Sequence, residues 1–253
     1  GIHGDEIRKA FVAEEGHMLV ALDYSQIELR VLALLSGEKT LISLFKKGVD
    51  IHTAVASEMF SVPPLEVSKD MRRKAKVINF GIIYGMGVTS LQRSLKSTRE
   101  EAQNFYDGYF KKFPGVAEYI ERIKEETAKK GYTETLFGRR RYIEGIRSHI
   151  PYIRSGAERM AVNAPIQGTA TGDIIKLAII QAEQMLKKEG LTESVFLLLQ
   201  VHDELVFEIK KDSVSRAVPL IKRVMEHVIE SEVPFIVDAS VGENWGEMKK
   251  FQI

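Results

Sequence analysis

The stretch Val201-His202-Asp203-Glu204-Leu205 places two adjacent acidic residues between two apolar runs. Residues 196–201 (FLLLQV) precede the acids, and residues 205–209 (LVFEI) follow them. Two such runs separated by a short polar stretch predict a β-hairpin whose tight turn carries the carboxylates. Polar residues also suit turns for conformational reasons alone, so this pattern by itself leaves a purely structural role open.

Length and composition limit the classes of protein to which this chain can belong. The 253 residues, 44% of them hydrophobic, are enough for one large domain or two modest ones with a real core. The net charge is only +1, so a polyanion partner would have to be bound by local basic clusters. The absence of cysteine excludes disulfides and thiolate chemistry, and it is typical of a reducing compartment. No segment approaches the roughly 18 apolar residues of a membrane span. We therefore expect a cytoplasmic protein without membrane association.

A second acid also follows an apolar run. Residues 18–22 (MLVAL) predict a buried strand that ends at Asp23, and a helix is expected to follow as far as Gly37. Residues 25–28 (SQIE) have the spacing of a capping box, so Glu28 has either a capping or a functional role. Asp23 and Asp203, each at a strand end, can converge on a pair of Mg²⁺ ions, which prefer oxygen ligands and bridge phosphates. This arrangement is typical of phosphoryl chemistry.

The segment from Ser68 to Gly85 predicts a helix with an unusual outer face. Residues 71, 75, 78 and 82 form its apolar stripe, whereas cations and aromatics follow one another on the opposite side at positions 72, 76, 80 and 84. From residue 72 to residue 80 the rise is about 12 Å, which suits a ligand with phosphates at one end and a flat ring at the other, such as a nucleoside triphosphate. The alternative is a solvated basic face whose aromatics pack under a neighbouring element.

Two further segments carry side chains suited to nucleic acid. Residues 139–141 are three arginines in a predicted loop, which could contact a phosphate backbone or simply be solvated. Arg159, Asn163 and Gln167 line up along a helical segment that we expect to break at residues 165–168. Near the C-terminus, a helix over residues 212–231, interrupted or kinked by Pro219, and an edge strand over residues 234–241 are predicted.

Three of these stretches resemble the sequence motifs of the family A DNA polymerases. Residues 23–30 (DYSQIELR) resemble motif A, residues 72–85 (RRKAKVINFGIIYG) motif B, and residues 200–205 (QVHDEL) motif C. The motifs are long, occur in the family's order, and the similarity extends over nearly the whole chain. The resemblance implies an α+β fold in which an antiparallel palm sheet accompanies a mostly helical fingers subdomain. Palm residues would be 1–45 and 151–253, with the fingers and connecting helices at 46–150.

The resemblance also implies an activity: template-directed addition of deoxynucleotides to a primer 3′-hydroxyl by two-metal phosphoryl transfer, with release of pyrophosphate. Two Mg²⁺ ions, for which Mn²⁺ could substitute, would be held by Asp23, Asp203 and the carbonyl of Tyr24. Asp23, Asp203, Glu204 and Lys76 are the implied catalytic residues. The implied nucleotide-binding residues are Arg72, Lys76, Phe80, Tyr84, His52, Gln26 and Glu28. The implied DNA contacts are Arg159, Asn163, Gln167, His202, Arg139, Arg140 and Arg141.

Individual roles follow from the same resemblance. Phe80 would pack on the sugar and base, Tyr84 would stack beside the template or nascent pair, and Glu28 would be a steric gate against a ribose 2′-hydroxyl. A thumb and an exonuclease domain precede motif A in the family but do not fit into the 22 residues before Asp23, so we expect a fragment or one part of a larger polymerase. Two other functions stay open: a module that only binds nucleotide or primer-template, and a metal-dependent phosphohydrolase.

Overall fold

The computed structural model describes residues 2–251, and its side chains are described from residue 6 onward. The chain forms two compact units. The first, here called the sheet unit, comprises Gly1–Ile27, Thr171–Glu230 and Phe235–Ile253; the second, the helical unit, comprises Glu28–Ala170 and Ser231–Pro234. Together they confirm the predicted α+β class. The boundaries between the two units lie after residues 27 and 170 and around residues 231–234, not after residues 45 and 150. The assignment of palm and fingers to residues 1–45, 46–150 and 151–253 stays a prediction.

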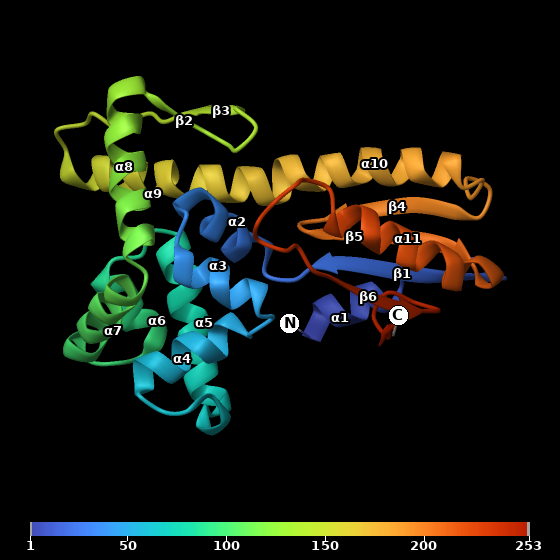
Figure 1. The fold of residues 1–253 in the computed structure, drawn as a ribbon, viewed down its shortest axis with the longest axis horizontal. Coiled ribbons are helices and arrows are strands. Elements are labelled where there is room, and N and C mark those ends of the chain that lie inside the picture. The colour runs from blue at the N-terminus through green and yellow to red at the C-terminus, as the bar shows by residue number, and fades with distance from the viewer. Residues whose placement is uncertain (1, 252–253) are drawn as a thin grey trace. The chain divides into compact units, whose positions relative to one another are not determined.

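The sheet unit is built on a five-stranded antiparallel sheet with the order β4-β5-β1-β6-β7. Figure 1 labels β1, β4, β5 and β6 of this sheet. Its strands are β1 (His17–Tyr24), β4 (Val195–Val201), β5 (Glu204–Lys210), β6 (Val237–Gly242) and β7 (Lys249–Lys250). The prediction of an edge strand near the C-terminus was wrong, because β6 pairs with β1 on one side and β7 on the other. The two residues of β7 are too few to leave a periodic signal in the sequence.

The core of the sheet unit forms around β1 and β5. Residues 19–22 of β1 and 205–207 of β5 are all buried, which explains why both strands read as continuous apolar runs. Helix α11 (Val214–Glu226) contacts β1, β5 and β6 and also packs on α10 (Ile175–Lys188). The helix ends at Glu226 rather than near residue 231, and Pro219 lies inside it. The remaining elements of this unit are α1 (Ile2–Lys9) and η3 (Lys211–Ser213).

The helical unit holds the rest of the chain. Its helices are mostly short and bounded by caps, as with Asp50 before α4 and the Thr98/Glu101 capping box before α7. Helix α2 starts at the last residue of the sheet unit, and η2 crosses the unit boundary at residue 170. The elements are α2 (Ile27–Ser36), α3 (Lys39–Lys46), α4 (Ile51–Phe60), η1 (Pro64–Glu66), α5 (Lys69–Ile83), α6 (Val88–Leu95), α7 (Arg99–Lys112), α8 (Pro114–Lys130), β2 (Tyr132–Glu134), β3 (Arg140–Tyr142), α9 (Pro151–Gln167) and η2 (Gly168–Ile174).

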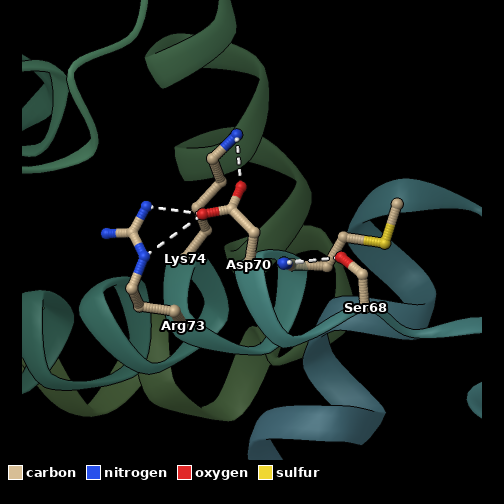
Figure 2. A network of polar contacts seen from close by, with 5 residues as sticks. Ser68, Asp70, Arg73 and Lys74 are labelled. Atoms are coloured by element: carbon tan, nitrogen blue, oxygen red, sulfur yellow. Dashed lines mark hydrogen bonds and ion pairs between the residues drawn. The ribbon is translucent and has the colours of Figure 1, made fainter.

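Helix α5 agrees closely with its prediction. Ser68 caps its first turn by accepting from the Met71 amide at 3.2 Å, and Asp70 then pairs with Arg73 and Lys74 (Figure 2). After the helix ends, Gly85 adopts φ +66°, a left-handed conformation that side chains rarely adopt. A Cβ at Gly85 would lie 2.8 Å from Cγ of Arg159 on α9, so this position requires glycine for space as well as for φ.

Two expectations for this unit were wrong. The segment around the three arginines is not a loop throughout, because residues 140–142 form β3 and pair with β2. The helix over residues 151–167 does not break at Pro165 but continues to Gln167 and then widens into the π-helix η2. Proline removes one backbone donor, and a local change of helical pitch can absorb such a disturbance without ending the helix.

None of the helices in the described part of the chain combines the length and the apolar character that crossing a membrane requires.

Candidate functional site

The turn between β4 and β5 presents its carboxylates as the sequence predicted. Val201 and Glu204 pair across it, so only His202 and Asp203 form the turn. His202 has φ 56°, in the left-handed region that histidine enters more readily than most residues. The Asp203 carbonyl accepts a hydrogen bond from the Tyr24 amide at 3.2 Å. This bond fixes the turn against the end of β1, where Asp23 lies.

Asp23 lies between two further acids. In the sheet register it faces Glu204 on β5 and Asp238 on β6. Directly opposite residues of neighbouring strands share one face of a sheet, so the three side chains project to the same side. Asp23, Asp203, Glu204 and Asp238 are here called the carboxylate cluster. Asp238 was missed from the sequence, where it looked like an ordinary polar position of an alternating strand; its carboxylate pairs with Nζ of Lys250 at 2.8 Å.

The cluster concentrates negative charge. Asp23 is exposed as a residue, yet partial desolvation and the carboxylates of Asp203, Glu204 and Asp238 raise its pKa to about 7, against a smaller opposing effect of Arg8. Burial also raises the pKa of Asp203. Both shifts mean that the fold holds these groups where their ionised forms are unfavourable unless a cation is present. Shifts of this kind are common at functional sites.

The donor set suits Mg²⁺. Every side-chain donor of the carboxylate cluster is an oxygen, the ligand type that Mg²⁺ prefers. Tyr24 offers a backbone carbonyl beside Asp23, and its position is fixed because its buried hydroxyl donates to the Met225 carbonyl at 2.7 Å. No group of three or more His, Asp or Glu side chains in the described residues has the geometry of a complete metal site. Mg²⁺ is usually held by one or two carboxylates together with substrate phosphates, so it does not require such a group.

The loop between β1 and α2 contains Gln26, which belongs to the sheet unit. Gln26 has φ 55° and is half-buried, and the preceding Ser25 amide donates to the Ile236 carbonyl at 2.8 Å. The loop is therefore tied to the segment that leads into β6. Gln26 follows Asp23 by three residues, which is the only sequence signal that connects it with the acids.

In the helical unit, α5 carries the predicted cation and aromatic face. Arg72 pairs with Asp50 at 2.6 Å, and Nζ of Lys76 lies 5.9 Å from the ring centroid of Phe80. Phe80 and Tyr84 stack with centroids 6.3 Å apart and ring planes inclined by 22°. Arg72, Lys76 and Tyr84 are exposed, and Phe80 is half-buried. The face therefore combines accessible cations with a flat apolar surface one to two helical turns further on.

His52 lies at the side of this face, on α4. Its side chain is 3% exposed, its Nδ1 lies 2.9 Å from Nδ2 of Asn79, and its ring is 5.9 Å from that of Phe80. Burial lowers the pKa of His52 to about 4, so the imidazole is neutral at neutral pH. With its Nδ1 accepting from Asn79, it offers one N–H donor, at Nε2, rather than a positive charge.

Glu28 and Tyr84, predicted separately, are brought together in the helical unit. The Tyr84 hydroxyl donates to Oε2 of Glu28 at 3.0 Å. This bond joins the start of α2 to the residue that caps the end of α5. A carboxylate is thereby fixed at the aromatic end of the α5 face.

The predicted DNA contacts divide into two groups. On α9, Arg159 donates to Oγ of Ser155 at 2.8 Å, Asn163 has a buried Nδ2 for which no hydrogen-bond partner is found among the described residues, and Gln167 is exposed. On the β2-β3 hairpin, Arg139 donates to the Gly168 carbonyl at 2.8 Å. Arg140 pairs with Glu134 at 2.8 Å, and Arg141 is exposed. Arg139 thereby brings the arginine run beside the end of α9 within the helical unit.

Comparison with known proteins gives consistent results. The family model for DNA polymerase family A matches residues 2–247. DNA polymerase I, thermostable, of Thermus aquaticus is 50% identical over 247 residues, which is 98% of this chain and 29% of the relative. DNA polymerase I of Pseudomonas aeruginosa is 46% identical over 96% of this chain and 26% of the relative. The solved POL domain of Pol1 from M. smegmatis, in complex with DNA primer-template and dNTP, superposes with a TM-score of 0.91 at 42% identity, covering 96% of this chain and 42% of that one.

Proposed function

Because the chain belongs to DNA polymerase family A, we propose that it performs template-directed DNA synthesis, adding deoxynucleotides to a primer 3′-hydroxyl and releasing pyrophosphate. The observation that carries the proposal is the position of Asp23, which faces Glu204 in the sheet and whose pKa is raised by desolvation and then by the carboxylate of Asp203. The chain spans about 29% of the length of its Thermus relative, so the activity is proposed for this chain from its own residues.

Two Mg²⁺ ions are the proposed cofactor, with Mn²⁺ as a substitute. Asp23, Asp203 and the Tyr24 carbonyl would hold them. When bound, the ions lower the pKa of the primer hydroxyl and neutralise charge on the leaving pyrophosphate. Glu204 would assist beside them, because it lies next to Asp23 and keeps one carboxylate oxygen available.

The residues of α5 would bind the incoming deoxynucleoside triphosphate. Arg72 and Lys76 would hold the phosphates, and Lys76 would also offset the charge that develops on the pyrophosphate. His52, neutral and buried, would donate its N–H to a phosphate oxygen. Phe80 would pack on the sugar and base, and Tyr84 would stack beside the template or nascent pair.

Sugar selection would depend on the hydrogen bond between Tyr84 and Glu28. The bond restricts Glu28 to one side of the aromatic face, so its carboxylate would occupy the space that a ribose 2′-hydroxyl needs. Gln26 would contact the nucleotide from the loop after β1. A hydrogen-bonded side chain is a more selective barrier than a mobile one, because it cannot move aside without breaking the bond.

Primer-template DNA is the proposed macromolecular partner. Arg159, Asn163 and Gln167 on α9, with His202 at the hairpin turn, would reach the minor groove and primer terminus, where correct base pairs share common acceptors. The exposed guanidinium of Arg141, with those of Arg139 and Arg140, would contact phosphates.

Primer extension with Mg²⁺ and all four deoxynucleotides tests the proposal. Asp23→Asn and Asp203→Asn should abolish extension, whereas Asp212→Asn, an exposed aspartate of the same unit, should leave it unchanged. If the two cluster variants extend primers as well as the parent chain, the metal assignment is wrong. Binding of primer-template without any extension by the parent chain, even at high protein concentration, would mean that the chain is a binding module. Release of nucleotides without a template would instead indicate a phosphohydrolase.

A further inference from the structure

Trp245 is the single tryptophan of the chain, and it contacts the carboxylate cluster from outside every polymerase motif. It lies between β6 and β7, half-buried, and its Nε1–H donates to Oε1 of Glu204 at 2.9 Å. Among the described residues, this indole is the hydrogen-bond donor found on the Glu204 side chain. The two residues are 41 positions apart in sequence.

The backbone around Trp245 is held from several sides. The Trp245 amide donates to the Phe11 carbonyl at 3.0 Å, and residues 12 and 244 form a β-bridge. Oδ1 of Asn244 accepts from the amides of Gly246 and Glu247 at 3.0 and 2.9 Å, which closes a turn that contains the tryptophan. The indole is therefore fixed by main-chain contacts that do not depend on Glu204.

The indole ring has two further side-chain contacts. Phe11 meets the ring edge to face, with centroids 5.6 Å apart and planes at 87°. The guanidinium carbon of Arg8 lies 4.7 Å from the indole centroid, a cation–π arrangement. Arg8 is also the cation that opposes the rise in the pKa of Asp23. Trp245 therefore contacts both the Glu204 carboxylate and the Arg8 guanidinium.

We propose that Trp245 is a positioning residue of the polymerase site: its indole N–H holds Glu204 in one orientation beside Asp23, and its ring holds Arg8 near the same acids. This inference rests on the proposed polymerase function. Glutamate has three rotatable side-chain bonds, and the negative charge of Asp23 directly opposite would push an unrestrained Glu204 away. The hydrogen bond to a fixed donor offsets that repulsion and keeps the second carboxylate oxygen at the site.

A spectroscopic experiment tests the contact independently of activity. In a ¹⁵N-labelled sample the single indole N–H gives one assignable cross-peak, which should move upfield in Glu204→Ala as the charge-assisted bond is lost. Glu208→Ala is the matched control, because that glutamate lies on the same strand and accepts instead from the Glu14 amide at 2.8 Å. An indole peak that is unmoved in Glu204→Ala, or that moves equally in both variants, would overturn the proposal.

A kinetic cycle then tests whether the contact positions the acid. Trp245→Phe removes the donor but keeps a ring against Phe11 and Arg8, so we expect about a tenfold loss of kcat, a raised half-saturating Mg²⁺ concentration and an unchanged KM for deoxynucleotide. In the Glu204→Ala background the same substitution should change neither kcat nor the Mg²⁺ dependence. Urea unfolding of the variants separates a loss of folding from a loss of positioning.

The outcomes distinguish a failure of the positioning role of Trp245 from a failure of the proposed polymerase function. If the parent chain extends primers and Trp245→Phe keeps its kcat and Mg²⁺ dependence, the indole is only a packing residue and the positioning role is wrong. The same conclusion follows if Trp245→Phe reduces kcat equally with and without Glu204. If the parent chain extends no primer while the indole peak moves in Glu204→Ala, the contact stands and the proposed polymerase function fails.

Discussion

Replacing Asp23 by asparagine should make the chain more stable at pH 8 while it removes the proposed catalytic function. The pKa of Asp23 is raised from 3.8 to about 7 in the folded chain, chiefly by desolvation and then by neighbouring carboxylates. Between these two pKa values the folded chain binds more protons than the unfolded one, so ionisation of Asp23 lowers stability as the pH rises. The loss begins near pH 4, is complete just above pH 7, and stays constant beyond.

The size of the effect is limited by exposure. A shift of this size without screening corresponds to about 4 kcal/mol, but Asp23 is exposed and water screens much of the repulsion, so about 1 to 2 kcal/mol is expected. Asparagine cannot ionise and avoids this penalty. The gain should therefore be near zero at pH 4, grow through pH 7 and then level off.

Urea unfolding of the parent chain and Asp23→Asn, measured from pH 4 to pH 8 with a chelator present, provides the measurement. Asp212→Asn is the control for removing one exposed carboxylate from the same unit, and it should show no such pH-dependent gain. Added Mg²⁺ should stabilise the parent chain more than Asp23→Asn. If Asp23→Asn is no more stable than the parent at pH 8, then desolvation and the neighbouring carboxylates do not disfavour the ionised form of Asp23 as the structure implies.

Three further predictions concern the helical unit. Glu28→Ala should admit ribonucleotides, measured as the ratio of kcat/KM for ribo- and deoxynucleotides, and an unchanged ratio would exclude the gate. Arg141→Ala should reduce the slope of log affinity for primer-template against log salt by about 0.9, the change expected for one phosphate contact, and an unchanged slope would remove this residue from the DNA interface. Gly85→Ala should destabilise the chain by about 2 to 3 kcal/mol in urea unfolding, because it adds a close contact with Arg159 to the left-handed strain; Gly131→Ala, with φ +84° and open space, should cost only about 1 kcal/mol, and equal losses would refute the contact.

The parts of the fold that local sequence could predict are those specified by local interactions. The β4-β5 hairpin needed only two apolar runs and a two-residue turn, and α5 needed only a cap, a stripe and a glycine. The position of β6 inside the sheet depends on which strands pair, and a short alternating run carries no information about its neighbours. Asp238 was missed for this reason, although its residue type was visible.

The candidate site shows the same division. Motif order identified the acids and the face of α5, but not the burial of His52 or the bond from Tyr84 to Glu28, which join separate helices. The contact of Trp245 with Glu204 joins segments that are remote in sequence and has no periodic signal. The arginine run was mistaken for a loop because a three-residue strand is too short to show alternation.

The register of β1 has a consequence for how this sequence can change. Asp23 shares a face with Glu204 and Asp238 because each strand alternates its side chains with a period of two. Deleting one residue between His17 and Leu22 would send Asp23 to the opposite face of the sheet and bring a neighbouring residue among the acids. The buried positions of β1 can therefore accept other apolar side chains of similar volume. A deletion or insertion of a single residue in this strand would not be tolerated, because it would remove Asp23 from the carboxylate cluster.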